Sequence, residues 1–333
     1  MKYYVGHPLQ TRGAEQYTLH GGKGEGMNFV YVRNGKGLEL WISLDRCADM
    51  TRVIFDGKNM GYLSPCGNVA PTFYDHEGMG FLKSFSAGFF TTCGFNGVGG
   101  PCCDEGENVP LHGTIGNMPA ELNGIEETDD GLTIKATVRD CVIFGRRMVL
   151  KRTYFVSYTQ NNFTVSDTVT NEGETTSPYL ILYHCNMGYP LLTENSIVRF
   201  PNEKMWGDTE NAKEHIDTAL IMEKPQQNFA ERCYFFDAAI GKNNKVHTGI
   251  FNPDIDAGVV FEYDKNELPC LTEWKMMGRR DYVLGIEPGN CFPCPRNEMR
   301  KKGVIKYLEP DQANTTSITF NFVNSLESFE KEF

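Results

Sequence analysis

The sequence predicts an all-β chain that folds as a large antiparallel sandwich with little helix. Three observations predict it: apolar and polar residues alternate with a period of two in short runs, helical periodicity is almost absent, and 34 Gly and 16 Pro are spread over the 333 residues. Because successive side chains of a strand point to opposite faces, such runs are typical of strands with one buried face. Short strands at this spacing favour a sandwich or a barrel over alternating strand–helix units.

The clearest alternation lies at residues 132–138 and 163–169, which are bounded by Gly, Asn or Asp. Runs of the same kind predict further strands at 28–32, 38–44, 148–157, 179–183, 247–251, 258–263, 282–286 and 317–322. No stretch keeps apolar residues at i, i+3, i+4 and i+7 over three turns, so we expect little helix. Residues 208–218 are the one plausible short helix. Since no linker, low-complexity segment or internal repeat interrupts the pattern, we expect one continuous β domain over residues 1–333.

The composition describes a globular chain with an acidic balance. Apolar residues make up 40% and aromatic residues 12%, and 32 Lys and Arg stand against 43 Asp and Glu, a formal net charge of −11. A chain of this length buries about 75% of its unfolded surface, so a large core is expected. The acidic balance argues against nucleic acid as a partner, because phosphate binding relies on clustered cations. We interpret the short basic cluster as a solvated loop; it comprises Arg296, Arg300, Lys301, Lys302 and Lys306.

The N-terminal segment and the cysteines indicate the cellular compartment. Residues 1–8 lack the apolar stretch of a signal peptide, and no run of about 18 apolar residues occurs, so we expect a cytoplasmic protein without a membrane partner. The eleven cysteines are odd in number and scattered, and we expect them to be reduced and mostly buried. Cys291 and Cys294 have the spacing of half a zinc site, but no second pair of ligands accompanies them, so we expect no metal.

Residues 88–121 are unusually rich in glycine. Five Gly within 13 residues allow the backbone to approach another group closely or to adopt a positive φ, and the segment leads to His112 and Gly113. We expect few of these residues in a core strand, and the segment is a candidate rim of a ligand pocket. The alternative is a long irregular crossover between sheets. Neither this segment nor the glycines at 21–26 carry the Gly-Lys-Ser/Thr ending of a nucleotide-binding loop.

Two apolar strands end in residues that suit a binding site. The run 179–183 leads into His184 and Asn186, an arrangement that presents polar side chains at the mouth or concave face of a sheet. A hydrogen-bonded core histidine is the alternative. The run 282–286 leads to Glu287, and an ionised carboxylate there must be paired, solvated or chemically useful, because burying it unpaired is costly. A surface Glu at a strand end is the alternative.

Several motifs of this chain occur together in one known family. They are LHG at 111–113, YHCNMGYP at 183–190, TEWKMMG at 272–278 and LGIEPGN at 284–290, joined by DRCADM at 45–50, LSP at 63–65 and GFNGVG at 94–99. In this combination the sequence resembles the DUF4432-type branch of the aldose 1-epimerase (galactose mutarotase-like) proteins. The resemblance covers most of the chain.

The resemblance implies a β-supersandwich with a carbohydrate site on its concave face. It also implies an isomerase that interconverts the α and β anomers of a hexose, or of an acidic or phosphorylated sugar, without cofactor or metal. In mutarotases a Glu removes the proton of the anomeric hydroxyl and a His protonates the ring oxygen. By this resemblance Glu287 is the catalytic base, His184 is the catalytic acid, and His112 binds and polarises sugar hydroxyls. Such a base and acid each contribute about 10²–10⁴-fold.

The other expected substrate-binding residues are Asn186, Lys275, Arg46, Asp49 and Trp274. The acid histidine opens HCNMGY here instead of the His-Pro-Tyr-Phe-Asn pattern of well-known mutarotases, which leaves the role of Asn186 open. Neither Trp274 nor Lys275 has a counterpart in those enzymes, and the ammonium of Lys275 would favour an acidic or phosphorylated sugar. In the alternative, Lys275 pairs with a neighbouring acid such as Glu273.

Two other functions are compatible with the same motifs. A non-catalytic carbohydrate-binding or sensing protein on this fold predicts saturable sugar binding without anomer exchange. A sugar epimerase acting at a carbon centre predicts uptake of deuterium from heavy water. A small-molecule carbohydrate is the expected partner in each case, and a homodimer is the assembly that the sequence leaves open.

Overall fold

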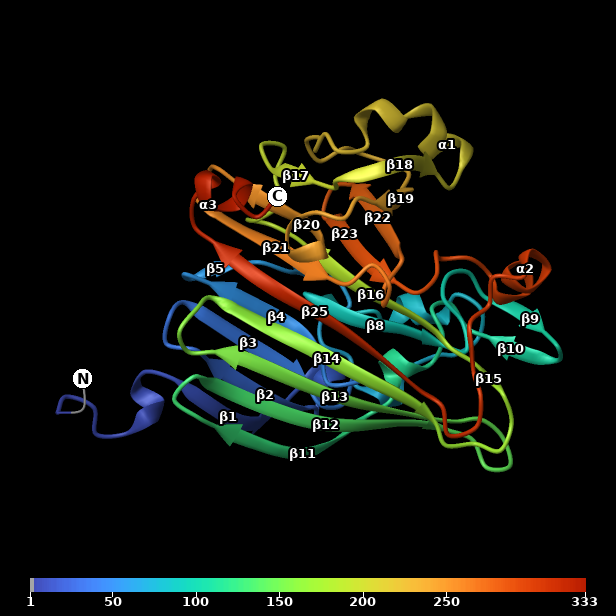
Figure 1. Cartoon of the computed structure of the whole chain (residues 1–333), viewed down its shortest axis with the longest axis horizontal. Helices are drawn as coiled ribbons and strands as arrows, with labels where there is room; N and C mark the ends of the chain where they lie inside the picture. Colours follow the sequence, from blue (N-terminus) through green and yellow to red (C-terminus); the bar gives the residue numbers. More distant parts are fainter. Residues whose placement is uncertain (1–2) are drawn as a thin grey trace.

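Two large antiparallel sheets packed face to face make up the fold (Figure 1). The computed structural model describes residues 3–333. The first sheet contains, in spatial order, β1 (Gly13–Thr18), β2 (Asn28–Arg33), β3 (Leu38–Ser43), β4 (Asp49–Phe55), β8 (Phe90–Phe95), β16 (Leu180–Met187), β23 (Tyr282–Gly289), β22 (Cys270–Met277), β19 (Arg232–Ala238) and β18 (Asn202–Gly207), with β5 (Lys58–Asn59) beside β4.

The second sheet contains, in spatial order, β11 (Ala120–Glu127), β12 (Gly131–Cys141), β13 (Arg147–Ser157), β14 (Asn162–Asn171), β25 (Ala313–Val323), β21 (Ala257–Tyr263), β20 (Val246–Asn252) and β17 (Ile197–Arg199). Short strands form three additional pairs: β6 (Tyr62–Leu63) with β7 (Ala87–Gly88), β9 (Cys102–Asp104) with β10 (Glu107–Val109), and β15 (Ser177–Pro178) with β24 (Tyr307–Leu308). The fold class predicted from the sequence, a large antiparallel β-sandwich, is confirmed.

Every run predicted to be a strand coincides with an observed strand, and only Leu44 and Tyr179, at the ends of two runs, lie just outside β3 and β16. In β14 the burial alternates along its whole length, as the run at 163–169 predicts. The outward residues of β14 face those of β25, where side-chain hydroxyls hydrogen-bond in pairs across the strands: Thr164 with Thr319, Ser166 with Ser317, and Thr168 with Thr315. Such cross-strand pairs stabilise a sheet and fix its register.

An aromatic core and one buried cation join the two sheets. Phe89, next to the first sheet, contacts Phe320 of the second, with ring centroids 5.4 Å apart. Arg152, on β13, is fully buried; its Nη1 lies 2.6 Å from Oδ1 of Asp49 on β4, and its Nη2 lies 2.6 Å from Oδ2 of Asp167 on β14. Arg152 therefore links the sheets through their interior.

The glycine-rich segment contains a core strand, so the expectation that few of its residues form one is wrong for its first part. Residues Phe90–Phe95 form β8, which is buried throughout and lies between β4 and β16 in the centre of the first sheet. A strand that is covered on both faces needs no alternation of apolar and polar residues. The period-two pattern therefore could not reveal it.

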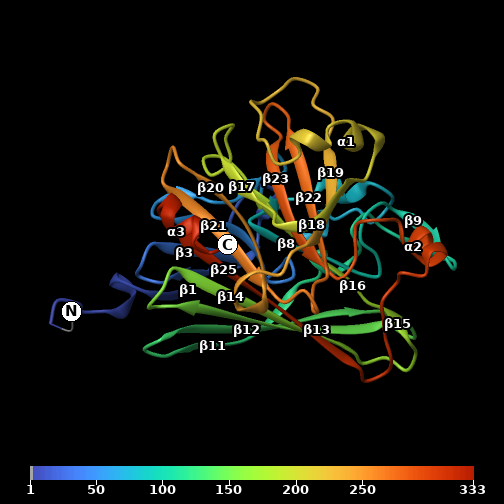
Figure 2. The ribbon, with the colours of Figure 1, turned by 45° about the horizontal axis from the view of Figure 1, so that its top comes forward.

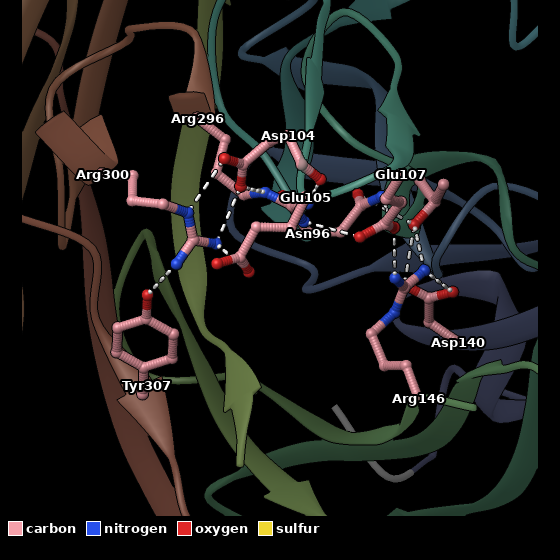
Figure 3. Close-up of polar contacts among 10 residues, drawn as sticks. Asn96, Asp104, Glu105, Glu107, Asp140, Arg146, Arg296, Arg300 and Tyr307 are labelled. Atoms are coloured by element: carbon pink, nitrogen blue, oxygen red, sulfur yellow. Dashed lines mark hydrogen bonds and ion pairs between the residues drawn. The ribbon is translucent and has the colours of Figure 1, made fainter. Parts of the chain in front are cut away.

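The basic cluster near the C-terminus is not a solvated loop. Residues Arg296–Lys302 form helix α2, and Arg296 is buried, with Nε 2.6 Å from Oδ2 of Asp104 and Nη1 2.8 Å from Oε2 of Glu107 (Figure 3). Arg300 also pairs with Asp104, and Arg146 binds the other oxygen of Glu107. The prediction failed because Asp104 lies 192 residues before Arg296 in the sequence.

The helices are short and lie outside the sheets. The candidate helix at 208–218 is confirmed in part, as α1 (Glu210–Glu214) followed by a 3-10 turn at Ile216–Thr218. Figure 2 shows α1 beside β19 at the top of the view, and α2 beside β9 at the end of the molecule away from the N-terminus. The third helix, α3 (Leu326–Glu330), packs against β21 and β25. Within residues 3–333, no helix combines the length and apolar character needed to cross a membrane.

All eleven cysteines are free thiols. The expectation that most are buried is wrong: only Cys47, Cys93, Cys185 and Cys291 are fully buried. Among the described residues, no three His, Cys, Asp or Glu side chains converge as a metal site would require.

Candidate active site

A row of side chains crosses the outer face of the first sheet. In β16 and β23 the register pairs Cys185 with Ile286, and this register places His184 opposite Glu287. Both Cys185 and Ile286 point into the core between the sheets, so His184 and Glu287 point away from it. The sequence placed His184 where an apolar strand ends, but β16 continues to Met187 and His184 lies in its middle.

The row borders a cavity of about 360 Å³. His112, His184, Glu287 and Trp274 line it together, and loop residues from 79–85, 99–112 and 293–295 form its walls. Small-molecule sites usually have volumes of about 300–1,000 Å³. This cavity lies near the lower end of that range and therefore suits a compact ligand. The four residues come from segments far apart in the sequence, and the fold brings them together at one cavity.

His184 and Glu287 form a close pair in the wall of the cavity. Nε2 of His184 lies 3.1 Å from Oε1 of Glu287, and the side chains are only 6% and 2% exposed. Nδ1 of His184 is buried and has no hydrogen-bond partner among residues 3–333. The pair is thus shielded from bulk water and retains bonding capacity toward a ligand.

Burial controls the protonation of this pair. It raises the pKa of Glu287 well above its usual value, and the nearby Glu231 adds to this effect. Burial and, to a smaller extent, the neighbouring His112 together lower the pKa of His184 to about 3. Burial therefore favours the neutral forms of both groups, with the shared proton on Glu287, and moving that proton from Glu287 to His184 leaves the net charge of the pair unchanged.

The glycine-rich segment positions His112 by close backbone contacts. His112 has a φ of 58°, its N–H donates to the carbonyl of Gly99 at 3.0 Å, and its carbonyl accepts from the N–H of Gly94 at 2.9 Å. A Cβ at Gly113 would collide with the carbonyl oxygens of Gly94 and Gly97. The predicted role of these glycines, close approach at the rim of a pocket, matches this geometry.

Aromatic rings surround His184. Its ring centroid lies 5.3 Å from that of Phe85, 5.2 Å from that of Trp274 and 5.5 Å from that of His112, each in an edge-on arrangement. The indole N–H of Trp274 donates to Oε2 of Glu231 at 2.8 Å. This packing fixes the orientation of the imidazole and presents apolar ring surface to the cavity.

A model of one protein family matches this chain over residues 24–322; it is described as a domain of unknown function, DUF4432. The chain belongs to the DUF4432 family. A comparison with curated proteins found no match.

Solved structures share the fold of this DUF4432 protein. A Klebsiella pneumoniae protein described provisionally as an aldose 1-epimerase is 26% identical, with a TM-score of 0.89 over 96% of this chain and 85% of its own. A galactose mutarotase-like protein from Clostridium acetobutylicum is 14% identical, with a TM-score of 0.69 over 95% of this chain and 99% of its own. Galactose 1-epimerase from Lactobacillus acidophilus is 14% identical, with a TM-score of 0.62 over 94% of this chain and 99% of its own. The DUF4432 protein has a galactose mutarotase-like fold.

Lys275 does not reach the cavity of the DUF4432 protein, contrary to its expected role in substrate binding. In β22 it follows Trp274 directly and points to the opposite face of the sheet. Its buried Nζ donates to the carbonyls of Thr218 at 2.8 Å and Ile221 at 2.6 Å, and lies 3.2 Å from Oε1 of Glu223. Lys275 therefore pairs with an acid, as the alternative predicted, but its partner is Glu223 and not Glu273.

Arg46 and Asp49 also lie outside the cavity, because other groups occupy their polar atoms. The Arg46 guanidinium donates to the carbonyls of Gly116, Val69 and Ser84. Asp49 accepts from Arg152 and from Thr92.

Asn186 is fully buried and does not line the cavity. Its Nδ2 donates to the carbonyl of His184 at 2.9 Å. It therefore supports the backbone of His184 instead of facing a ligand.

Several cavity residues were missed from the sequence. Phe81, Phe85, Asp208, Glu231 and Cys233 line the cavity, and none of them carries a motif that marks a site. The register pairs Cys233 with Trp274, which places it on the face that carries Glu287. This register depends on strand pairing between distant segments and has no local sequence signal.

The DUF4432 protein should lose stability as the pH falls from 7 to 5, partly through His112. Burial lowers the pKa of His112 to about 4, whereas an unfolded histidine has a pKa of about 6.5. The unfolded chain therefore binds the proton first, so this contribution is complete above pH 6.5 and shrinks as the pH falls toward 4.

Between pH 7 and 5 the protonation of His112 alone should lower the free energy of unfolding by on the order of 2 kcal/mol. Chemical denaturation at both pH values measures this loss of stability. The loss should be smaller in His112→Asn, where asparagine tolerates the positive φ of this position. It should be unchanged in the control His76→Asn, because His76 is exposed. Equal losses in all three proteins would contradict the assignment.

Proposed function

We propose that this protein is an aldose 1-epimerase-like isomerase, which interconverts the α and β anomers of a hexose or a modified hexose. The observation that carries the proposal is the buried His184–Glu287 pair, 3.1 Å apart at the surface of a cavity of about 360 Å³. An acid and a base that share one proton are what ring opening and closure of a sugar require. The similarity of fold to a galactose 1-epimerase supports it.

In the proposed reaction the proton of the pair first moves from Glu287 to His184, and the ionised Glu287 then accepts the proton of the anomeric hydroxyl, O1–H. The bond between C1 and the ring oxygen O5 breaks as C1–O1 becomes a carbonyl, and His184 gives its proton to O5. Rotation about C1–C2 presents the other face of the carbonyl to O5, and the reverse transfers close the ring and restore the pair. Because O1 and O5 are bonded to the same carbon, two neighbouring groups on adjacent strands can serve both oxygens.

His112 and Trp274 hold the sugar in this proposal. The imidazole of His112 is neutral at pH 7, since burial lowers its pKa to about 4, and its buried Nδ1 has no hydrogen-bond partner among the described residues. It can therefore donate to or accept from a sugar hydroxyl. The indole of Trp274 offers a flat apolar surface to a sugar ring, and Glu231 fixes its orientation.

Heavy water separates this chemistry from that of a carbon-centre epimerase. Ring opening moves protons between oxygen atoms only, so we expect anomer exchange without deuterium at any carbon. The sugar is incubated with the protein in heavy water, where NMR follows the exchange between anomers. After prolonged incubation, NMR of the recovered sugar measures the deuterium at each carbon. Deuterium at a carbon would identify epimerisation at that centre and contradict the proposal.

The rate of anomer exchange should depend weakly on pH around neutrality. Turnover requires one proton on the pair, so it falls where a second proton binds and where the last proton leaves. Since burial lowers the pKa of His184 and raises that of Glu287, we expect the acid limb well below 6.5, the ordinary value for histidine. An acid limb of enzyme-dependent exchange near pH 6.5, measured by NMR after subtraction of the buffer rate, would contradict this protonation scheme.

A further inference from the structure

A second and larger cavity adjoins the proposed reaction cavity. Its volume is about 520 Å³, and both cavities are bordered by Asp208, Pro293 and Cys294. A single hexose in the reaction cavity would leave the second cavity unfilled. The second cavity therefore needs an explanation that the proposed reaction at C1 does not supply.

An aromatic cluster forms one wall of the second cavity. The ring centroids of Phe235 and Phe292 are 4.7 Å apart, and Trp206 lies 5.3 Å from Phe292. The register across β18, β19, β22 and β23 pairs Trp206 with Phe235, Phe235 with Thr272, and Thr272 with Glu287. The cluster therefore lies on the same face as Glu287, with Phe235 about 10 Å from it, two strand spacings away. Flat aromatic surface at this reach suits a second ring of the same ligand.

Two lysines without an ion-pair partner also line the second cavity. Lys302, at the end of α2, and Lys306 line the cavity, and within residues 3–333 neither forms an ion pair within 4.0 Å. Nζ of Lys302 lies 3.8 Å from Sγ of Cys294, and the carboxylate of Asp208 lines the same cavity. The other cations of the same cluster are paired: Arg296 and Arg300 with Asp104, and Lys301 with Glu298. The pairing of Arg296 and Arg300 fixes α2 (Figure 3), so Lys302 is presented from a rigid support.

We propose that the second cavity is a substrate subsite for an acidic second ring, and that the substrate is a reducing disaccharide with a carboxylate on its non-reducing sugar. The inference rests on the proposed function, because exchange at C1 requires a free anomeric hydroxyl. The second ring must then be attached through another oxygen of the reacting sugar. The aromatic wall packs against the second ring, and Lys302 and Lys306 bind its carboxylate as point charges.

Calorimetric titration tests the subsite independently of turnover. The probes are glucose, reducing glucosyl-glucoses with 1→3, 1→4 and 1→6 linkages, and their glucuronosyl-glucose counterparts. For at least one linkage we expect the acidic disaccharide to bind about tenfold more tightly than the neutral one, and the neutral disaccharide to bind more tightly than glucose. Absence of this order for every linkage would overturn the proposal.

Variants locate the effect. In Lys302→Ala the advantage of the acidic over the neutral disaccharide should shrink severalfold, and in Trp206→Ala the advantage of disaccharides over glucose should shrink. The matched control is Lys301→Ala, one residue away on α2, whose charge is exposed and paired with Glu298; both advantages should persist in it. Equal loss of affinity for all three classes of sugar in Lys302→Ala would indicate a structural role and overturn the assignment.

Anomer exchange by NMR, measured on the same sugars, reports the proposed function separately. Selective binding without exchange would leave the subsite in place and remove the isomerase activity. Exchange of glucose without selective binding of any disaccharide would support the isomerase activity and overturn the subsite.

Discussion

Glu287→Gln should abolish enzyme-dependent anomer exchange, with a loss of at least about 10²–10⁴-fold, while sugar binding changes little. The amide has the size of the carboxyl group and still accepts a hydrogen bond, but it cannot take the proton of the anomeric hydroxyl. Stability should not fall, because burial already disfavours the ionised form of Glu287. NMR magnetisation exchange measures turnover, and calorimetric titration measures binding.

The chain offers a matched control for this variant. His247 and Glu262 form a second His–Glu pair, on adjacent strands of the second sheet, with Nε2 and Oε2 3.8 Å apart. Glu262→Gln removes the same carboxylate chemistry from a pair outside the cavity and should leave exchange unchanged. Retained turnover in Glu287→Gln would remove Glu287 from the mechanism.

Arg152→Met should destabilise the fold by about 3–5 kcal/mol, the usual cost of removing one partner from a buried ion pair. The substitution leaves the carboxylates of Asp49 and Asp167 in the core between the sheets without a counter-charge. Urea denaturation measures the change in the free energy of unfolding. The control Lys331→Ala breaks an exposed pair with Glu327 and should cost less than about 1 kcal/mol.

A compensating variant separates the charge effect from lost packing. If uncompensated carboxylates cause the loss, Arg152→Met combined with Asp49→Asn and Asp167→Asn should recover part of the stability. A triple variant less stable than Arg152→Met would show that the hydrogen-bond network, and not the charge balance, holds the sheets together here.

The sequence predicted strands with one buried face best. Residues 163–169 alternate because one face of β14 is covered by the core, so the burial period appears directly in the sequence. Phe90–Phe95 carries no such period, since β8 is covered on both faces. The helix at Arg296–Lys302 was missed because its acidic partner Asp104 is provided by a distant hairpin.

The candidate site was predicted where it depends on motifs and missed where it depends on register. The resemblance placed His112, His184 and Glu287 in one site, and Trp274 was expected there as an aromatic residue beside Lys275. The structure brings all four to one cavity. The expectation for Lys275 conflicts with the strand period, because Trp274 and Lys275 are consecutive residues of β22 and must point to opposite faces.

The central claim, that the pair of His184 and Glu287 catalyses ring opening, is tested most directly by NMR magnetisation exchange between α and β anomers in the presence of the intact protein. The panel includes neutral, acidic and phosphorylated aldoses. We expect at least one aldose to exchange faster than in buffer, in proportion to the protein concentration. If aldoses bind but none exchanges faster than in buffer, the protein is a carbohydrate-binding module and the catalytic assignment fails.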